Sequence, residues 1–191
     1  MDFLVQRKIS LESIKLYGLG LESSKIHKFY NRIIIPIRTP HGELMGYQGR
    51  VIDPEINPKY LFTKGLLKQQ TLFGFDVCAK DMFQQDVATI TEGTLNQIIL
   101  RQAGIPSVAK MGTGISETQM ALLARVTDNV VVVEDGDKYG TIDAETTNKL
   151  LQANGFNSIV MSLKDFQTND ANDFVLEYSF NQLHEYWYSH L

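Results

Sequence analysis

Cysteine is nearly absent from this sequence. The 191 residues include one, Cys78, which excludes an intrachain disulfide and a zinc site built from several thiolates. We therefore expect no zinc in this chain and a reducing, cytosolic setting, with Cys78 as a small buried side chain. A histidine metal site is not expected either, because metal-ligand spacing is missing from the four histidines, His27, His41, His184 and His190.

Long hydrophobic runs are also missing. No apolar run approaches the roughly 20 residues of a membrane-spanning helix, and the first ten residues lack the apolar segment of a secretory signal. Repeats and low-complexity tracts are absent. With 43% hydrophobic and 21% charged residues, the composition is that of a globular chain of one ample domain or two small ones.

Charge is divided unevenly along the chain. Residues 1–80 hold 12 Lys and Arg against 7 Asp and Glu, whereas residues 81–191 hold 6 against 15, which gives the net charge of −4. A basic half beside an acidic half suggests a polyanion held by one and a metal held by the other. The alternative is that both halves are ordinary solvated surface.

From residue 74 onwards, short apolar strands alternate with helical segments, which predicts an α/β parallel sheet covered on both faces. Ser116 and Gln119 form a capping box for one of these helices. We expect a basic N-terminal subdomain over 1–80, an acidic α/β subdomain over 81–170 and a C-terminal helix over 171–191. The alternating segments are helix 74–83, strand 87–91, helix 94–103, strand 105–109, helix 116–126, strand 129–134, helix 138–153 and strand 156–162.

Carboxylates follow two of the predicted buried strands. Glu92 comes after the run VATIT, and Asp135-Gly136-Asp137 comes after the run VVVVE. Because ligands of open α/β sheets bind beyond the carboxyl ends of the strands, we expect these acids to converge there. Three hard oxygen donors suit Mg²⁺ or Mn²⁺ rather than zinc. Taken alone, Asp-Gly-Asp can also be a simple turn.

The N-terminal part predicts a helix over 10–17 and a β-hairpin. The strands RIIIPIR (32–38) and LMGYQGR (44–50) flank the turn TPHGE. If the hairpin keeps its register, the even separations of Arg32, Arg38 and Arg50 put these arginines on one face. That face would bind phosphates, or it is a solvated outer surface.

Basic and aromatic residues are interleaved in the segment 53–72. Lysines can meet phosphates while rings stack on bases, so this composition suits a single-stranded nucleic-acid track. Tyr60, Leu61 and Phe62 can equally be core residues. The lysines in question are Lys59, Lys64 and Lys68.

Almost the whole chain resembles the catalytic core of bacterial and phage replicative DNA primases, in which a basic subdomain precedes a TOPRIM fold. Six segments match in order: FLVQRKISLESIKLYGLG, the hairpin RIIIPIRTPHGELMGYQGR, PKYL with LFGF, then EG, MGTG and DGDKYG. The resemblance implies an α/β fold with an antiparallel hairpin followed by a TOPRIM sheet. It also implies a nucleotidyltransferase that makes short RNA primers on single-stranded DNA.

The resemblance assigns a role to each matching residue. Glu92 would be a metal ligand or general base, and Asp135 and Asp137 would bind the divalent ions. Asp170 is implied as a further ligand, and Asp173 is expected to cap the last helix. Residues implied or expected to hold nucleotide or template are Arg38, Arg50, Lys59, Lys64, Lys68, Gly112 and Thr113, with Lys59 also implied in catalysis.

Two positions depart from the family pattern. Asn96 and Asn172 stand where the family has aspartates, which lowers the expected affinity for a second or third ion. The implied partners are single-stranded DNA, ribonucleoside triphosphates, a replicative helicase and a separate zinc-binding module, in a bacterial cytoplasm. Two alternatives stay open: a primase-like module that binds single-stranded DNA or a helicase, which the two asparagines favour, and a TOPRIM nuclease.

Overall fold

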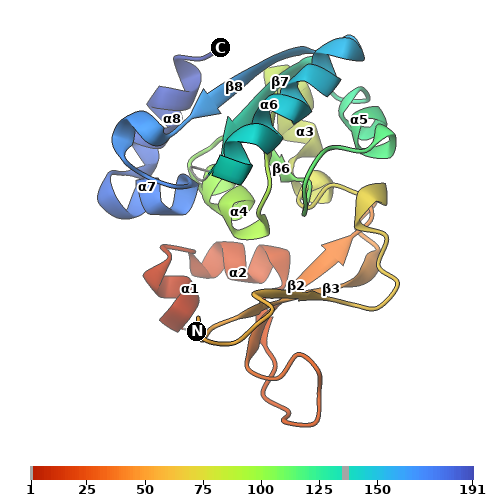
Figure 1. Ribbon diagram of the computed structural model, residues 1–191, viewed down its shortest axis with the longest axis vertical. Helices are drawn as coiled ribbons and strands as arrows, with labels where there is room; N and C mark the ends of the chain where they lie inside the picture. Colours follow the sequence, from red (N-terminus) through yellow and green to blue (C-terminus); the bar gives the residue numbers. More distant parts are fainter. Residues whose placement is uncertain (1, 135–137) are drawn as a thin grey trace. The chain divides into compact units, whose positions relative to one another are not determined.

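This α/β chain contains two sheets, one antiparallel and one parallel. The computed structural model describes residues 2–134 and 138–191 (Figure 1). The chain divides into the units Met1–Leu67 and Lys68–Leu191. This division precedes the expected boundary near residue 80, because Leu72, Phe75 and Cys78 belong to the hydrophobic core of the second unit.

The first unit contains the predicted hairpin, widened into an antiparallel sheet of order β1-β2-β3-β4. Ile33, Ile35 and Ile37 alternate along β2 and are at most 1% exposed, so burial of one strand face stabilises the sheet. The short outer strands were not predicted, since two or three residues carry too little periodicity. The strands are β1 (Gly20–Leu21), β2 (Arg32–Arg38), β3 (Leu44–Val51) and β4 (Tyr60–Phe62).

The hairpin register contradicts the expected shared face of arginines. Arg50 pairs with Ile33, and Arg32 pairs with Val51. Cross-strand partners project to the same face and strand neighbours to opposite faces, so Arg32 and Arg50 lie on opposite faces. A register irregularity between Ile37 and Arg38 also interrupts the alternation of faces before Arg38. Even spacing in the sequence does not put these arginines on one face, because the turn and this bulge set the register of the hairpin.

Helices α1 (Asp2–Gln6) and α2 (Leu11–Tyr17) precede the first strand. Ser10 begins α2 as its N-cap and accepts a hydrogen bond from the Ser13 backbone, as its sequence position predicts. Gly18 ends α2 with a positive φ of 68°, and its N–H donates to the last-turn carbonyls.

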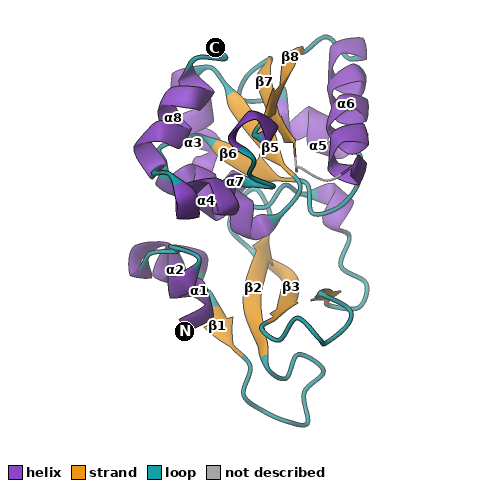
Figure 2. Cartoon of the chain, turned by 60° about the vertical axis from the view of Figure 1, so that its left-hand side comes forward, coloured by secondary structure: helices purple, strands orange, loops and turns teal. Residues whose placement is uncertain are grey.

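The second unit contains a four-stranded parallel sheet of order β6-β5-β7-β8. Helix α6 lies on one side of this sheet, and α7 and α8 lie on the other (Figure 2). The strands are β5 (Ala88–Thr91), β6 (Ser107–Ala109), β7 (Asn129–Glu134) and β8 (Asn157–Ser162). The remaining elements are η1 (Lys68–Gln70), α3 (Phe75–Gln85), α4 (Thr94–Gln102), α5 (Glu117–Leu123), α6 (Lys138–Ala153), η2 (Lys164–Phe166), α7 (Ala171–Glu177) and α8 (Phe180–Tyr188).

Both faces of this sheet are covered, which explains the uninterrupted apolar strands. Ile90 and Val132 belong to one core cluster with residues of α3, α5 and α6. On the other face, the buried Trp187 donates its indole N–H to the Thr89 hydroxyl at 2.9 Å. The α/β alternation predicted from residue 74 is therefore confirmed.

The C-terminal segment packs on the core but forms two helices, so the expected single helix over 171–191 is wrong. Helix α7 ends at Glu177, and Ser179 caps α8 by accepting from the Gln182 N–H. A serine cap starts a new helix where the apolar pattern alone continues. Among the described residues, none of the helices combines the length and apolarity needed to span a membrane.

Candidate active site

Two acidic residues lie at the carboxyl ends of neighbouring parallel strands. Glu92 directly follows β5, and Glu134 is the last residue of β7. These strands pair with Ile90 opposite Val132, so both ends reach the same edge of the sheet. The predicted edge therefore exists, and β7 leads directly to it. The predicted ligands Asp135 and Asp137 lie outside the described residues.

Glu134 is bound within an ion-pair network at this edge. Its carboxylate forms an ion pair with Lys164 and accepts from the Thr141 hydroxyl at 2.5 Å. Burial raises the pKa of Glu134, but hydrogen bonds from Lys164, Thr141 and Ser162 outweigh burial and hold the pKa below its usual value. The network connects the end of β7 to α6 and to η2. Sequence reasoning gave Glu134 no role of its own.

The loop after β6 runs beside Glu92. The Lys110 N–H donates to the Thr91 carbonyl and the Met111 N–H to the Glu92 carbonyl, both at 3.1 Å. These bonds continue the parallel ladder past the end of β5. The loop then continues into Gly112-Thr113-Gly114. The predicted residues Gly112 and Thr113 therefore come directly after Met111, which bonds to Glu92.

Lys68 lies against the same turn. A Cβ added to Gly112 would lie 2.8 Å from Lys68 Nζ, so the ammonium occupies space that a side chain would take. Gln119 donates to the carbonyl of Thr71 at 2.9 Å and to that of Lys110 at 3.2 Å. These bonds join the segment that carries Lys68 to the loop that carries the turn. Lys68 therefore lies against Gly112, and the predicted role of Lys68, Gly112 and Thr113 in binding nucleotide or template stays a prediction.

A buried ion pair that the sequence did not reveal supports the turn from the other side. Lys110 and Asp143 form this pair, with side chains 2% and 11% exposed. Lys110 Nζ also donates to the Gly112 carbonyl at 2.9 Å, and the Gly114 N–H donates to Asp143 Oδ1 at 2.5 Å. No local motif links residues that lie 33 positions apart, so only the fold brings them together.

Asp170 caps a helix in the structure. Its Oδ1 accepts from the Asp173 N–H at 2.8 Å at the start of α7. The N-cap role expected for Asp173 is therefore wrong, because Asp170 has the extended backbone that an N-cap requires. A metal role for Asp170 stays a prediction.

The remaining predicted basic residues belong to the first unit. Arg50 is 7% exposed and its guanidinium lies 5.0 Å from the Tyr60 ring centroid. Lys59 is exposed beside the same ring, and Lys64 is also exposed. Arg38 is half-buried and donates to the Gly42 carbonyl at 3.1 Å.

Arg32 is not available as a surface cation. It is 4% exposed, it donates to the Pro58 carbonyl at 2.9 Å, and burial lowers its pKa.

Oxygen donors at this edge fit a hard divalent cation. Glu92 is half-buried and follows a rigid buried strand, which keeps a carboxylate at a fixed place with little loss of conformational freedom. Within residues 2–134 and 138–191, no cluster of three or more His, Cys, Asp or Glu could by itself hold a metal. The predicted ligands Asp135 and Asp137 lie outside these residues, so their part in a metal site with Glu92 stays a prediction.

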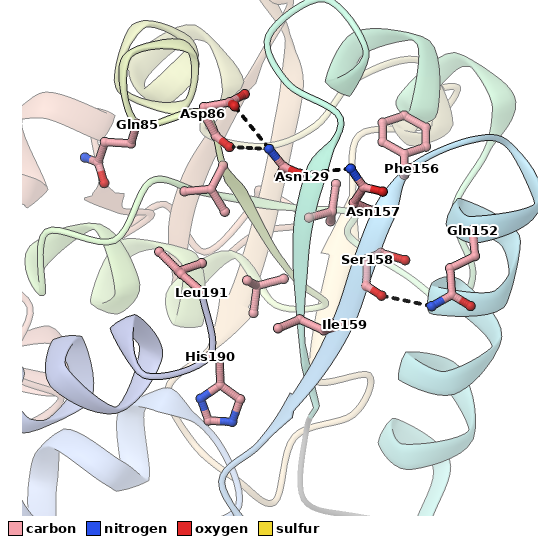
Figure 3. Close-up of a pocket in the computed structure, with 13 residues that line it drawn as sticks. Gln85, Asp86, Asn129, Gln152, Phe156, Asn157, Ser158, Ile159, His190 and Leu191 are labelled. Carbon is pink, nitrogen blue, oxygen red and sulfur yellow. Dashed lines mark hydrogen bonds between the residues drawn. The ribbon is translucent and has the colours of Figure 1, made fainter.

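A cavity of about 660 Å³ in the second unit lies at the opposite ends of the strands. Figure 3 shows Asn129 between Asp86 and Asn157, with the side chains bonded in a row. These three side chains bond to one another, and further polar residues such as Gln152 line the cavity together with apolar ones. This cavity has no convergent group suited to phosphoryl chemistry, so the acidic edge is the better candidate.

Comparison with known families agrees with this arrangement. The family model for the N-terminal domain of the DNA primase catalytic core matches residues 3–79, and a Toprim-like model matches residues 89–175. The chain belongs to the DNA primase family. Toprim domains generally bind divalent metal ions, which agrees with the acidic edge of this primase core.

The primase core covers part of its relatives. DNA primase of Listeria innocua is 31% identical over 182 residues, which make up 91% of this chain and 29% of that protein. The chain thus spans about three tenths of the length of that curated relative.

Solved primases share the fold. The zinc-binding and RNA polymerase domains of Aquifex aeolicus primase match with a TM-score of 0.88 and 23% identity, over 98% of this chain and 55% of that one. A primase catalytic domain bound to single-stranded DNA matches with a TM-score of 0.79 and 24% identity, over 98% and 72%.

Asn96 and Asn172, which the resemblance places where the family has aspartates, are buried in this primase core. Asn96 lies in α4 and is 7% exposed, and Asn172 lies in α7 and is 1% exposed. An amide costs far less to bury than an unpaired carboxylate. These positions therefore suit the interior between two packed helices better than an exposed ion site.

Proposed function

We propose that this chain is the catalytic core of a primase that joins ribonucleoside triphosphates into short RNA primers on single-stranded DNA. RNA primer synthesis is the general function of the family. The observation that carries the proposal is the acidic edge, where Glu92 follows β5 and the neighbouring β7 leads into Asp135. The bacterial cytoplasm is the proposed location, and a replicative helicase and a separate zinc-binding module are the proposed partners.

Magnesium or manganese would be held by Glu92, Asp135 and Asp137, with Asp170 as a further ligand. Such ions lower the pKa of the attacking 3′-hydroxyl and neutralise charge on the transferred phosphoryl group. The chain's own task is to fix its carboxylates before substrate arrives, which rigid strand ends do well.

Basic residues supply the binding side of the proposal. Lys68 and the turn Gly112–Thr113 would hold a nucleotide phosphate, because an ammonium and backbone N–H groups both suit anions. In the first unit, Arg50 and Lys59 would hold triphosphate or template backbone, and Lys59 would assist catalysis. Arg38 and Lys64 would contact the template backbone.

The test is incorporation of labelled ribonucleotides on single-stranded DNA with Mg²⁺ or Mn²⁺. Asp135→Asn should abolish the products, because it removes a ligand charge at the acidic edge. The matched control is Asp128→Asn, which changes an exposed aspartate next to the other end of β7 and should retain synthesis. Products that persist in Asp135→Asn would contradict the proposal, as would degradation of the DNA in place of synthesis.

The buried amides Asn96 and Asn172 favour one second candidate, a primase-like module that binds single-stranded DNA or a helicase without synthesis. This candidate predicts metal-independent DNA binding and no RNA product. It would replace the first if a primase zinc-binding module added in trans also failed to restore synthesis.

A further inference from the structure

Next to the acidic edge, a small polar cavity of about 210 Å³ opens on the glycine turn, which we define as Gly112-Thr113-Gly114. Lys68, Lys110 and Gln119 contribute to its lining, and all of them belong to the second unit. The cavity thus combines cationic side chains with the backbone of a tight turn, which is an arrangement suited to an anionic group.

One hydrogen bond at each end holds this glycine turn. Lys110 pairs with Asp143 and donates to the Gly112 carbonyl at 2.9 Å. The second carboxylate oxygen of Asp143 accepts from the Gly114 N–H at 2.5 Å. The ion pair therefore holds the first and last residues of the turn on helix α6.

Stability alone does not account for such a pair. Lys110 and Asp143 are 2% and 11% exposed, so both charges have lost most of their hydration. Well-packed apolar side chains of similar volume are often as stabilising as a buried ion pair, or more so. The charged pair instead contributes geometric specificity, because its hydrogen bonds determine which backbone groups of the turn it contacts and where those groups lie.

The position of Lys68 depends on the same turn. A Cβ at Gly112 would lie 2.8 Å from Lys68 Nζ, so the Lys68 ammonium packs against the turn. A shift of the turn would therefore change the position of this ammonium. Ser116 follows the turn and donates to the Gln69 carbonyl at 2.7 Å, which ties the chain neighbour of Lys68 to the same loop.

We propose that Lys110 and Asp143 are positioning residues that set the glycine turn and Lys68 in the arrangement that receives a nucleotide phosphate. This inference rests on the proposed function and deepens it, because it assigns nucleotide affinity to a pair that does not touch the nucleotide. The pair acts through the turn and supplies no step of the chemistry.

The decisive variant replaces both charges with apolar side chains, Lys110→Met together with Asp143→Leu. It removes the contacts to the turn without leaving one buried charge unpaired, so the melting temperature should equal or exceed that of the wild type. The dissociation constant for ATP, measured by calorimetric titration with Mg²⁺, should rise about tenfold, which corresponds to one displaced charge-assisted contact. In primer synthesis, KM for ATP should rise by a similar factor while kcat changes little.

A second variant restores hydrogen bonding without charge. Lys110→Gln together with Asp143→Asn keeps a donor for the Gly112 carbonyl and an acceptor for the Gly114 N–H, so it should recover most of the ATP affinity. The control is Asp86→Ala, which removes side-chain hydrogen bonds at the opposite end of the sheet. It should lower the melting temperature and leave the ATP dissociation constant unchanged.

The possible failures can be told apart. If the wild type binds ATP and the apolar double variant binds it equally well, the positioning role is overturned while the proposed function stands. If the apolar variant does not fold, unchanged ATP affinity in Asp143→Asn, which removes the charge alone, together with unaltered amide exchange at Gly114 would overturn it. If the wild type binds no ATP and makes no primer, the proposed function fails and this inference fails with it.

Discussion

Replacement of Gln119 should destabilise the second unit far more than a change of one exposed side chain would. Gln119 is 2% exposed and accepts from the Ser116 N–H at 3.1 Å. Its amide donates to the carbonyls of Thr71 at 2.9 Å, Lys110 at 3.2 Å and Lys68 at 3.4 Å. One side chain thus joins the capping box of α5 to two other segments.

The magnitude follows from those bonds. Gln119→Met keeps the length and nearly the volume of the side chain, so the cavity term is small. Each of the two shorter bonds to buried carbonyls contributes about 1 kcal/mol, and the capping bond contributes about 1 kcal/mol more. We therefore expect the free energy of unfolding to fall by about 3 kcal/mol.

Urea unfolding at pH 7, followed by circular dichroism, measures this loss. The matched control is Gln152→Met, because Gln152 donates a single bond, to the Ser158 carbonyl at 2.9 Å. The control should lose about 1 kcal/mol or less. Equal losses in the two variants would refute the reasoning that Gln119 joins three segments.

The variant Gln119→Glu tests the same contacts through pH. Its carboxyl would be buried and would face the carbonyl oxygens of Lys68, Thr71 and Lys110, so its pKa in the folded state would lie above the unfolded value of about 4.3. The folded state then binds the extra proton more tightly, and the variant's stability relative to wild type should fall as pH rises from 4 to 7. A pH-independent difference would contradict the geometry.

Three further results are expected. Gly74→Ala should cost about 2–5 kcal/mol in urea unfolding, because Gly74 has a φ of +82° and a new Cβ would lie 2.6 Å from Gln97 Nε2; a loss below 1 kcal/mol would contradict this. Glu134 has a lowered folded-state pKa, so its contribution to stability is present above its unfolded pKa and is lost as pH falls through the folded value; Glu134→Gln should therefore show a smaller loss than wild type between pH 7 and pH 3. Asp86→Ala should lower stability by about 2 kcal/mol through loss of bonds such as that from Asn129, yet leave primer synthesis intact at 25 °C.

The second unit could be predicted well because its signals are local. Buried parallel strands are continuous apolar runs, and Ser116 with Gln119 marks a helix start without help from distant residues. The acidic edge followed from the same reasoning, since the carboxyl ends of parallel strands meet. The position of Glu92 directly after β5 agrees with that reasoning, and its role as a metal ligand or general base stays a prediction.

The rest depended on information that local patterns do not carry. Arg32 and Arg50 were separated by the register of a bulged hairpin, and the break at Ser179 divided a continuous amphipathic pattern. The pair of Lys110 and Asp143 forms only when α6 packs beside the loop after β6. Such contacts between distant segments are a product of tertiary structure.

The measurement that tests the account most directly is templated synthesis on homopolymer DNA. With labelled ATP and Mg²⁺ or Mn²⁺, we expect alkali-labile products on oligo-dT and none on oligo-dA, and Glu92→Gln should abolish them. Asp128→Asn should behave as wild type, because this exposed residue is next to the far end of β7. Incorporation that ignores the template, or that survives Glu92→Gln, would contradict a primase whose acidic strand ends carry the chemistry.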